Sequence, residues 1–285
     1  MFKGDVNLII FGGLRNDRTG LLCEWLNTLD MKKIVFFITV PLMLYTVAIG
    51  QTQKNVAHNT NAWLMYFGSH KLNYKWGLHL EAQLRRSEFF SEPQQLLLRG
   101  GINYHLNAQV FFTAGYCFVE TYPYGEQPAK ATYPENRFWE QVQIKTQLQK
   151  IEWISRYRLE QRFSKLPVEN PPGVFEPGEA VYTNRMRILN RVSIPFKGQL
   201  IADKSFYFTA YDEIMWNWGE NTGPNLLDQN RLCGALGYVI PVAGRLEIGY
   251  LLQSIYKADG IRVEQNHTFQ LALFSNINFF RKPKA

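Results

Sequence analysis

A regular alternation of apolar and charged residues runs through segment 151–163. The odd positions are mainly apolar and the even positions mainly charged, so that Ile151, Trp153, Tyr157, Leu159 and Phe163 alternate with Glu152, Arg156, Arg158, Glu160 and Arg162. Side chains alternate across a β-strand with a period of two. The segment therefore predicts a strand with one apolar face and one densely charged face.

The same period recurs along most of the chain. It is clear in segments 72–85, 137–149, 182–194, 245–256 and 266–279, and looser in 94–106, 107–122, 204–218 and 228–240. A helical period of 3.6 fits these segments poorly. We therefore expect an all-β chain of long strands.

The connections between these segments alternate in length. Short ones lie near 69–71, 105–107, 149–151, 196–203 and 241–244, and longer ones rich in Pro and Gly lie near 87–93, 121–135, 165–179, 219–227 and 258–263. Short turns at one end and long loops at the other are typical of an outer-membrane barrel. The pattern predicts an antiparallel up-and-down transmembrane β-barrel of about 10–12 strands.

The number of strands is less well defined by the pattern than their type. We count 11 candidate segments. Because bacterial barrels usually have even numbers, 10 or 12 strands are expected, and 12 is favoured.

The N-terminal region has the layout of an export signal. Met31, Lys32 and Lys33 precede an apolar run from Ile34 to Ile49, and small residues near Gly50 suit cleavage before Gln51. Segment 31–50 is therefore predicted to be a secretory signal peptide, with a single membrane anchor as the alternative. Residues 1–30 then form an over-called upstream extension or, alternatively, a cytoplasmic tail. The barrel is expected over 51–280, followed by a short basic tail at 281–285.

Alternation alone does not decide which face lies inside the barrel. A secreted lipocalin-like barrel or sandwich would bury the apolar face, whereas a membrane barrel would expose it to lipid. Strands of 12–15 residues favour the membrane, and so does a last strand that ends at Phe279 and Phe280. Aromatic residues near strand ends suit interfacial girdles, namely Trp63, Tyr66, Tyr104, Tyr122, Trp139, Trp216, Trp218 and Phe279.

A membrane barrel would place the charged face in its lumen. Arg and Glu on neighbouring strands can then pair bidentately and offset the cost of burial. The predicted polar network of the lumen consists of His79, Glu81, Arg85, Arg99, Glu152, Arg156, Arg158, Glu160, Arg162, Arg185, Arg187, Arg191, Glu213 and Glu247.

No motif in the sequence indicates a catalytic site, a cofactor or a metal. There is neither a Gly-rich phosphate loop nor an HExxH motif, and the three cysteines lack metal-ligand spacing. His79 lies two residues from Glu81 on a polar face, where a place in the lumen network is favoured over a catalytic base. Asp212 and Glu213 are adjacent and therefore face opposite sides.

Four functions from different classes remain. The favoured one is a structural barrel or a narrow, plugged pore with a charged lumen, with outer-membrane lipid and the barrel-assembly machinery as partners. The alternatives are an outer-membrane enzyme or lipid-binding barrel, and a secreted lipocalin-like binding barrel. A net charge of +7 would also suit a nucleic-acid partner. Nucleic acid is disfavoured, because the arginines are interleaved with glutamates and the chain is expected to be exported. The sequence sets no oligomeric state.

Six segments also resemble those of a known family. They are the strand around Trp63, LHLEAQLR (78–85), LLLRGGINYHL (96–106), YRLEQRF (157–163), NRMRILNR (184–191) and NHTFQLALF (266–274). In this order they resemble the uncharacterised outer-membrane β-barrels of Bacteroidota grouped as domain of unknown function 2490. The resemblance covers about residues 55–280 and leaves out residues 1–30. It implies a barrel in the outer membrane of a Gram-negative bacterium and implies no activity.

Overall fold

The computed structural model describes residues 54–223 and 225–279. The predicted upstream extension, signal peptide and basic tail lie outside these residues. No helix in this part of the chain is long and apolar enough to cross a membrane.

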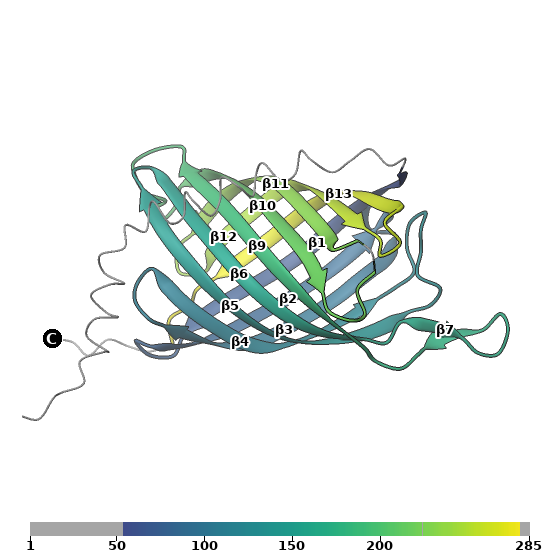
Figure 1. Ribbon diagram of the computed structural model, residues 1–285. Coiled ribbons are helices and arrows are strands. Elements are labelled where there is room, and N and C mark those ends of the chain that lie inside the picture. Colours follow the sequence, from purple (N-terminus) through teal and green to yellow (C-terminus); the bar gives the residue numbers. More distant parts are fainter. Residues whose placement is uncertain (1–53, 224, 280–285) are drawn as a thin grey trace, which may run out of the picture. The chain divides into compact units, whose positions relative to one another are not determined.

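Eleven long strands in the described residues close into one barrel, which confirms the predicted all-β class (Figure 1). They are β1 (Asn55–Lys71), β2 (Trp76–Ser87), β3 (Glu92–His105), β4 (Val110–Thr121), β5 (Tyr133–Leu148), β6 (Ile151–Ser164), β9 (Val181–Pro195), β10 (Phe206–Trp218), β11 (Leu227–Ile240), β12 (Gly244–Tyr256) and β13 (Arg262–Ser275). A short hairpin of β7 (Pro167–Glu169) and β8 (Phe175–Pro177) stands apart from the barrel wall, and a 3-10 turn, η1 (Glu88–Phe90), follows β2.

The barrel closes through a parallel pair. Every other neighbouring pair is antiparallel, but β1 and β13 run in the same direction from Asn55↔Arg262 to Gly68↔Ser275. The preference for 12 strands is therefore wrong, and so is the option of 10. An odd number of up-and-down strands leaves the first and last strands pointing the same way, so closure has to be parallel.

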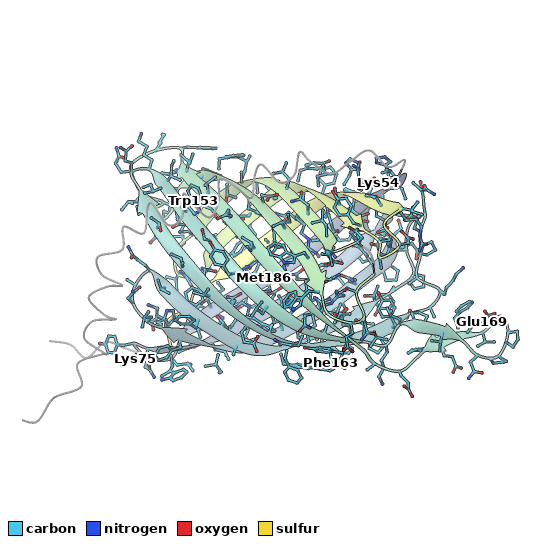
Figure 2. The ribbon with its side chains drawn as sticks, viewed as in Figure 1. Lys54, Lys75, Trp153, Phe163, Glu169 and Met186 are labelled. Carbon is cyan, nitrogen blue, oxygen red and sulfur yellow. The ribbon has the colours of Figure 1, made fainter. Side chains whose placement is uncertain are left out.

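Parallel closure places the start of β1 and the end of β13 at opposite ends of the barrel. One end, called here the short-turn end, carries the connections 72–75, 106–109, 149–150, 196–205 and 241–243. The other, the long-loop end, carries 88–91, 122–132, 165–180, 219–226 and 257–261. Figure 2 shows Lys54 and Glu169 toward the long-loop end and Lys75 at the opposite end.

Local hydrogen bonds explain two of the short turns. The side-chain oxygen of Asn73 accepts from the backbone N–H groups of Lys75 and Trp76, both at 2.9 Å. Asn107 does the same one hairpin later, for Gln109 and Val110, both at 2.8 Å. An Asn side chain that mimics a turn in this way ends one strand and starts the next.

The two faces of the barrel wall have opposite polarity. On β6, Leu159 on the outer face is 42% exposed, while its neighbour Glu160 on the inner face is 1% exposed. The outer face also exposes many large apolar residues, among them Leu64, Leu84, Ile102, Phe138, Leu236 and Ile248. Buried side chains are mostly polar or charged, which inverts the arrangement of a water-soluble barrel.

Trp63 and Trp139 do not belong to an aromatic girdle. They lie inside the barrel, at 2% and 1% exposure, in two small apolar clusters on the inner wall. Trp139 has the same inward phase as Arg137 and Gln141 on β5. The expectation that they lie at an interface is therefore wrong, because strand phase sets their direction.

Candidate functional site: a charged barrel interior

Charged side chains from nine strands and one loop fill the interior of the barrel. Its cations are Arg85, Arg99, Arg137, Lys145, Arg156, Arg158, Arg162, Arg185, Arg187, Arg191, Arg231, Arg245 and Lys257, and its acids are Glu81, Glu135, Glu152, Glu160, Glu213, Asp228, Glu247 and Glu264. Cations outnumber acids, so the interior carries a positive surplus at neutral pH.

Glu160 of β6 is the centre of one cluster of ion pairs. Its side chain is fully buried and accepts hydrogen bonds from Arg185 Nε and Arg187 Nη1 of β9, both at 2.9 Å. Arg99 of β3 reaches Glu160 Oε1 from the other side, at 3.4 Å. Since β4 and β5 separate β3 from β6 in the wall, this contact crosses the interior.

Glu213 of β10 is the centre of a second cluster. Arg187 donates to both of its oxygens, at 2.8 and 2.9 Å, and Arg156 donates at 2.7 Å. Arg231 of β11 lies farther away, at 3.5 Å. Arg187 thus holds two carboxylates at once, which joins the two clusters. Bidentate guanidinium–carboxylate pairs are among the stronger polar contacts in proteins.

The joined clusters form a continuous ionic belt across the barrel. We define the belt as Glu81, Arg99, Glu160, Arg187, Glu213 and Arg231, contributed by β2, β3, β6, β9, β10 and β11. Arg99 starts it by pairing with Glu81 on the neighbouring strand.

The belt lies between two cavities. The long-loop chamber has a volume of about 330 Å³ and the short-turn chamber about 350 Å³. Glu81, Arg187 and Arg231 of the belt line both chambers, together with Gln83. The belt therefore lies where the two chambers meet, with one chamber toward each end of the barrel.

Further ion pairs line each chamber. In the long-loop chamber Glu135 accepts from Arg162 Nη2 at 3.0 Å, and Asp228 accepts from Arg185 at 2.9 Å. In the short-turn chamber Glu152 accepts from Arg245 at 2.6 and 3.1 Å.

Two β-bulges near the long-loop end turn polar side chains inward, and one of these, Asp228, lines the long-loop chamber. Gln94 and Asp228 have no partner in the strand register, because the pairing shifts beside each of them. Gln94 accepts a hydrogen bond from the Trp63 indole at 2.8 Å, and Asp228 meets Arg185. A bulge re-aims a side chain in this way while leaving the rest of the strand paired.

One loop crosses the mouth at the long-loop end. The hydroxyl of Tyr124, in the β4–β5 connection, donates to Glu264 Oε2 of β13 at 2.8 Å. The backbone N–H of Glu126 donates to Asn59 Oδ1 of β1 at 3.3 Å. Burial, together with the Glu264 carboxylate, raises the pKa of Tyr124 well above its usual value, so this hydroxyl stays protonated as a donor. We call segment 122–132 the latch loop.

Gly125 allows the latch loop to lie this close to the wall. Its φ is +68°, and an added Cβ would lie 2.3 Å from Asn59 Oδ1. Both the backbone conformation and the contact require glycine.

All fourteen residues of the predicted network lie on the inward phase of their strands. Ten are buried, and four, namely His79, Arg156, Arg162 and Arg191, are partly buried. The belt contains Glu81, Arg99, Glu160, Arg187 and Glu213. Glu152 and Glu247 lie apart from it: Glu152 binds Arg245 and Lys145, and Glu247 binds Arg191 and Tyr207.

His79 packs edge-on against Trp139, with ring centroids 5.2 Å apart, and its Nε2 lies 3.4 Å from Glu81 Oε2. Among the described residues, no group of three His, Cys, Asp or Glu side chains could hold a metal ion.

The sequence-based network omitted several charged residues of the interior. These are Glu135, Arg137, Lys145, Asp228, Arg231, Arg245, Lys257 and Glu264. Strand phase could have identified Arg137 and Arg245, because both occupy polar positions of clearly alternating segments. Asp228 could not be found by phase, because a bulge sets its direction.

Comparison with known proteins gives one match. The model of a family described as "Protein of unknown function (DUF2490)" matches residues 60–264. No curated protein and no solved structure matches the chain significantly.

Proposed function

The chain belongs to this family, and we propose that it is an outer-membrane β-barrel whose interior the ionic belt closes to bulky solutes. The observation that carries the proposal is the inverted polarity of the wall, apolar outside and charged inside. The predicted signal peptide at 31–50 would direct export, and outer-membrane lipid and the barrel-assembly machinery would be its partners.

The dimensions of the wall suit a bilayer. The barrel strands contain 12–17 residues, whereas about 9–11 suffice for a tilted strand to cross the hydrocarbon. A soluble barrel of this sequence would expose a contiguous apolar surface to water, which monomeric soluble proteins rarely do.

Two acidic residues of the outer face, Asp212 and Glu140, are paired with amides. Asp212 accepts from Asn230 at 2.8 Å, and Glu140 accepts from Gln161 at 3.2 Å. These contacts reduce the cost of placing an acid against lipid, which for Asp and Glu is smaller than for Arg and Lys.

The belt supports a closed or very narrow passage. Six charged side chains joined by ion pairs lie between the two chambers. Displacing any one of these side chains would break a buried ion pair. We therefore expect little conductance from the resting barrel.

Membrane fractionation with gel electrophoresis tests the proposal. The chain is expressed from Met31, the outer membrane is isolated, and samples are run unheated and boiled. Outer-membrane localisation with a mobility shift on boiling is the expected result. A periplasmic protein without a shift would overturn the proposal and favour the secreted lipocalin-like barrel.

One observation favours lipid binding as a second candidate function. A groove of about 570 Å³ on the outer face is lined by outward residues including Ile102, Tyr104, Phe112 and Tyr157, around the small Ala114. Ala114→Leu would narrow this groove at its centre. If the barrel binds a lipid there, mass spectrometry of the purified protein should detect that lipid with the wild-type chain and less of it with the variant. Equal amounts in both would exclude the groove as the lipid site.

A further inference from the structure

The long-loop chamber has more positive charge than its carboxylates can balance. Eight of the residues that line it are Arg or Lys, whereas four are Asp or Glu, and the two further carboxylates that pair with these arginines, Glu160 and Glu213, still leave two cations in excess. Transfer of a charge out of water is strongly unfavourable unless another charge compensates it. The surplus therefore favours an anion in this chamber.

Arg85 is the clearest uncompensated cation. It is 6% exposed, lines the chamber and forms no ion pair with any Asp or Glu of the described residues. Its guanidinium donates only to neutral amide oxygens: Nε and Nη2 to Gln83 at 3.0 and 2.6 Å, and Nη1 to Gln95 at 2.7 Å. These amides fix the plane of the guanidinium without neutralising it.

Arg231 lies against the same indole. The guanidinium carbons of Arg85 and Arg231 lie 4.0 and 5.3 Å from the Trp63 ring centroid. Arg231 donates to Gln229 at 3.0 Å, and its contact with Glu213 is long, at 3.5 Å. Two guanidinium groups thus pack against the same indole ring. Of the two, only Arg231 is near a carboxylate, and that contact is long.

We propose that the long-loop chamber binds a small free oxyanion, such as phosphate, sulfate or a short carboxylate, at Arg85 and Arg231. Planar guanidinium groups bind oxyanions through paired N–H donors, which suits this class of ligand better than a halide. The chamber volume of about 330 Å³ and the latch loop across the mouth favour a small solute over a lipid headgroup. The site depends on the chamber and not on the membrane location of the barrel.

Calorimetric titration with inorganic phosphate tests the proposal. The purified protein is titrated at constant ionic strength, with sodium chloride making up the balance. The expected result is saturable binding of one phosphate per chain. Heat that does not saturate, or equal heat from chloride, would overturn the proposal.

Variants locate the site. Arg85→Gln should weaken phosphate binding about tenfold or more, the size expected for one charge-assisted hydrogen bond. Arg158→Gln is the matched control, because Arg158 also lies over a tryptophan (Trp139, 4.6 Å) and donates to a glutamine (Gln141) but lines the other chamber. The control should change the affinity by less than about twofold. Equal weakening by both variants would contradict a localised site.

A second variant covers the case in which Arg85→Gln does not fold, as judged by gel mobility. Arg231→Gln should then show the same loss of phosphate affinity. An unchanged affinity in Arg231→Gln would overturn the site.

Discussion

Arg187 on β9 donates through Nη2 to both oxygens of Glu213 on the neighbouring strand β10, at 2.8 and 2.9 Å, and through Nη1 it also donates to Glu160. One guanidinium thus connects the two carboxylate clusters of the interior. Two of the three carboxylates of the belt, Glu160 and Glu213, are each paired with more than one arginine.

Glu160→Gln should destabilise the barrel by up to about 3–5 kcal/mol, because it removes a carboxylate shared by several buried guanidinium groups, of which Arg185 keeps only Asp228 and Arg187 only Glu213. Arg185 and Arg187 would lose their shared partner. Denaturant titration in lipid vesicles, followed by gel mobility, measures the change. The matched control is Glu140→Gln on the outer face of β5, which should cost less than about 1 kcal/mol. Equal losses of stability in the two variants would show that the ion pairs of Glu160 contribute no more to folding than a contact on the outer face.

Removing one pair from the belt should open the barrel. The double variant Arg187→Ala/Glu213→Ala keeps the net charge and deletes the link between the two clusters, so the chambers should join. Planar-bilayer recordings should show a stable conductance that the wild-type barrel lacks. Lys145→Ala/Glu152→Ala deletes a pair at the short-turn end and serves as the control. A large pore in the wild-type protein would refute the proposal that the belt closes the barrel.

Leu159→Arg tests which face meets lipid. A cation on a lipid-facing strand costs about 2–4 kcal/mol near the bilayer midplane, so less folded barrel should reach the outer membrane. Leu166→Arg, at a similarly exposed leucine in the β6–β9 connection, should have little effect. The fraction of each variant that shifts in mobility between unheated and boiled samples on gels measures how much barrel has folded. Normal assembly of Leu159→Arg would argue for a water-facing wall.

Gly125→Ala should release the latch loop. The added Cβ would meet Asn59 and the residue would be strained at φ +68°. Gly173→Ala is the matched control, since its φ of +83° carries similar strain but an added Cβ meets nothing within 4 Å. Trypsin cleavage at Lys130 should become about tenfold faster in Gly125→Ala, as local opening of about 1.4 kcal/mol predicts. Similar cleavage of both variants would show that the effect comes from backbone strain at a positive φ and not from the contact with Asn59.

Local pattern accounts for the strands and their faces. Period-two alternation is a property of neighbouring residues, so Leu159 and Glu160 could be assigned to opposite faces without any tertiary information. The same rule would have placed Trp139 inside, where Arg137 and Gln141 share its phase. The girdle prediction gave position along the strand more weight than phase, and for this reason it was wrong for Trp63 and Trp139.

The sequence by itself determined an all-β chain whose long strands each have one apolar and one charged face. The tertiary structure decided the parallel closure of β1 on β13, because strand count and direction become coupled only when the sheet closes. It also decided which charges meet: Arg99 and Glu160 are far apart in sequence and on non-neighbouring strands, and only the curvature of the wall brings them together. Alternation is fixed by bonds along the chain, whereas the belt, its two chambers and the uncompensated Arg85 depend on distances across the barrel.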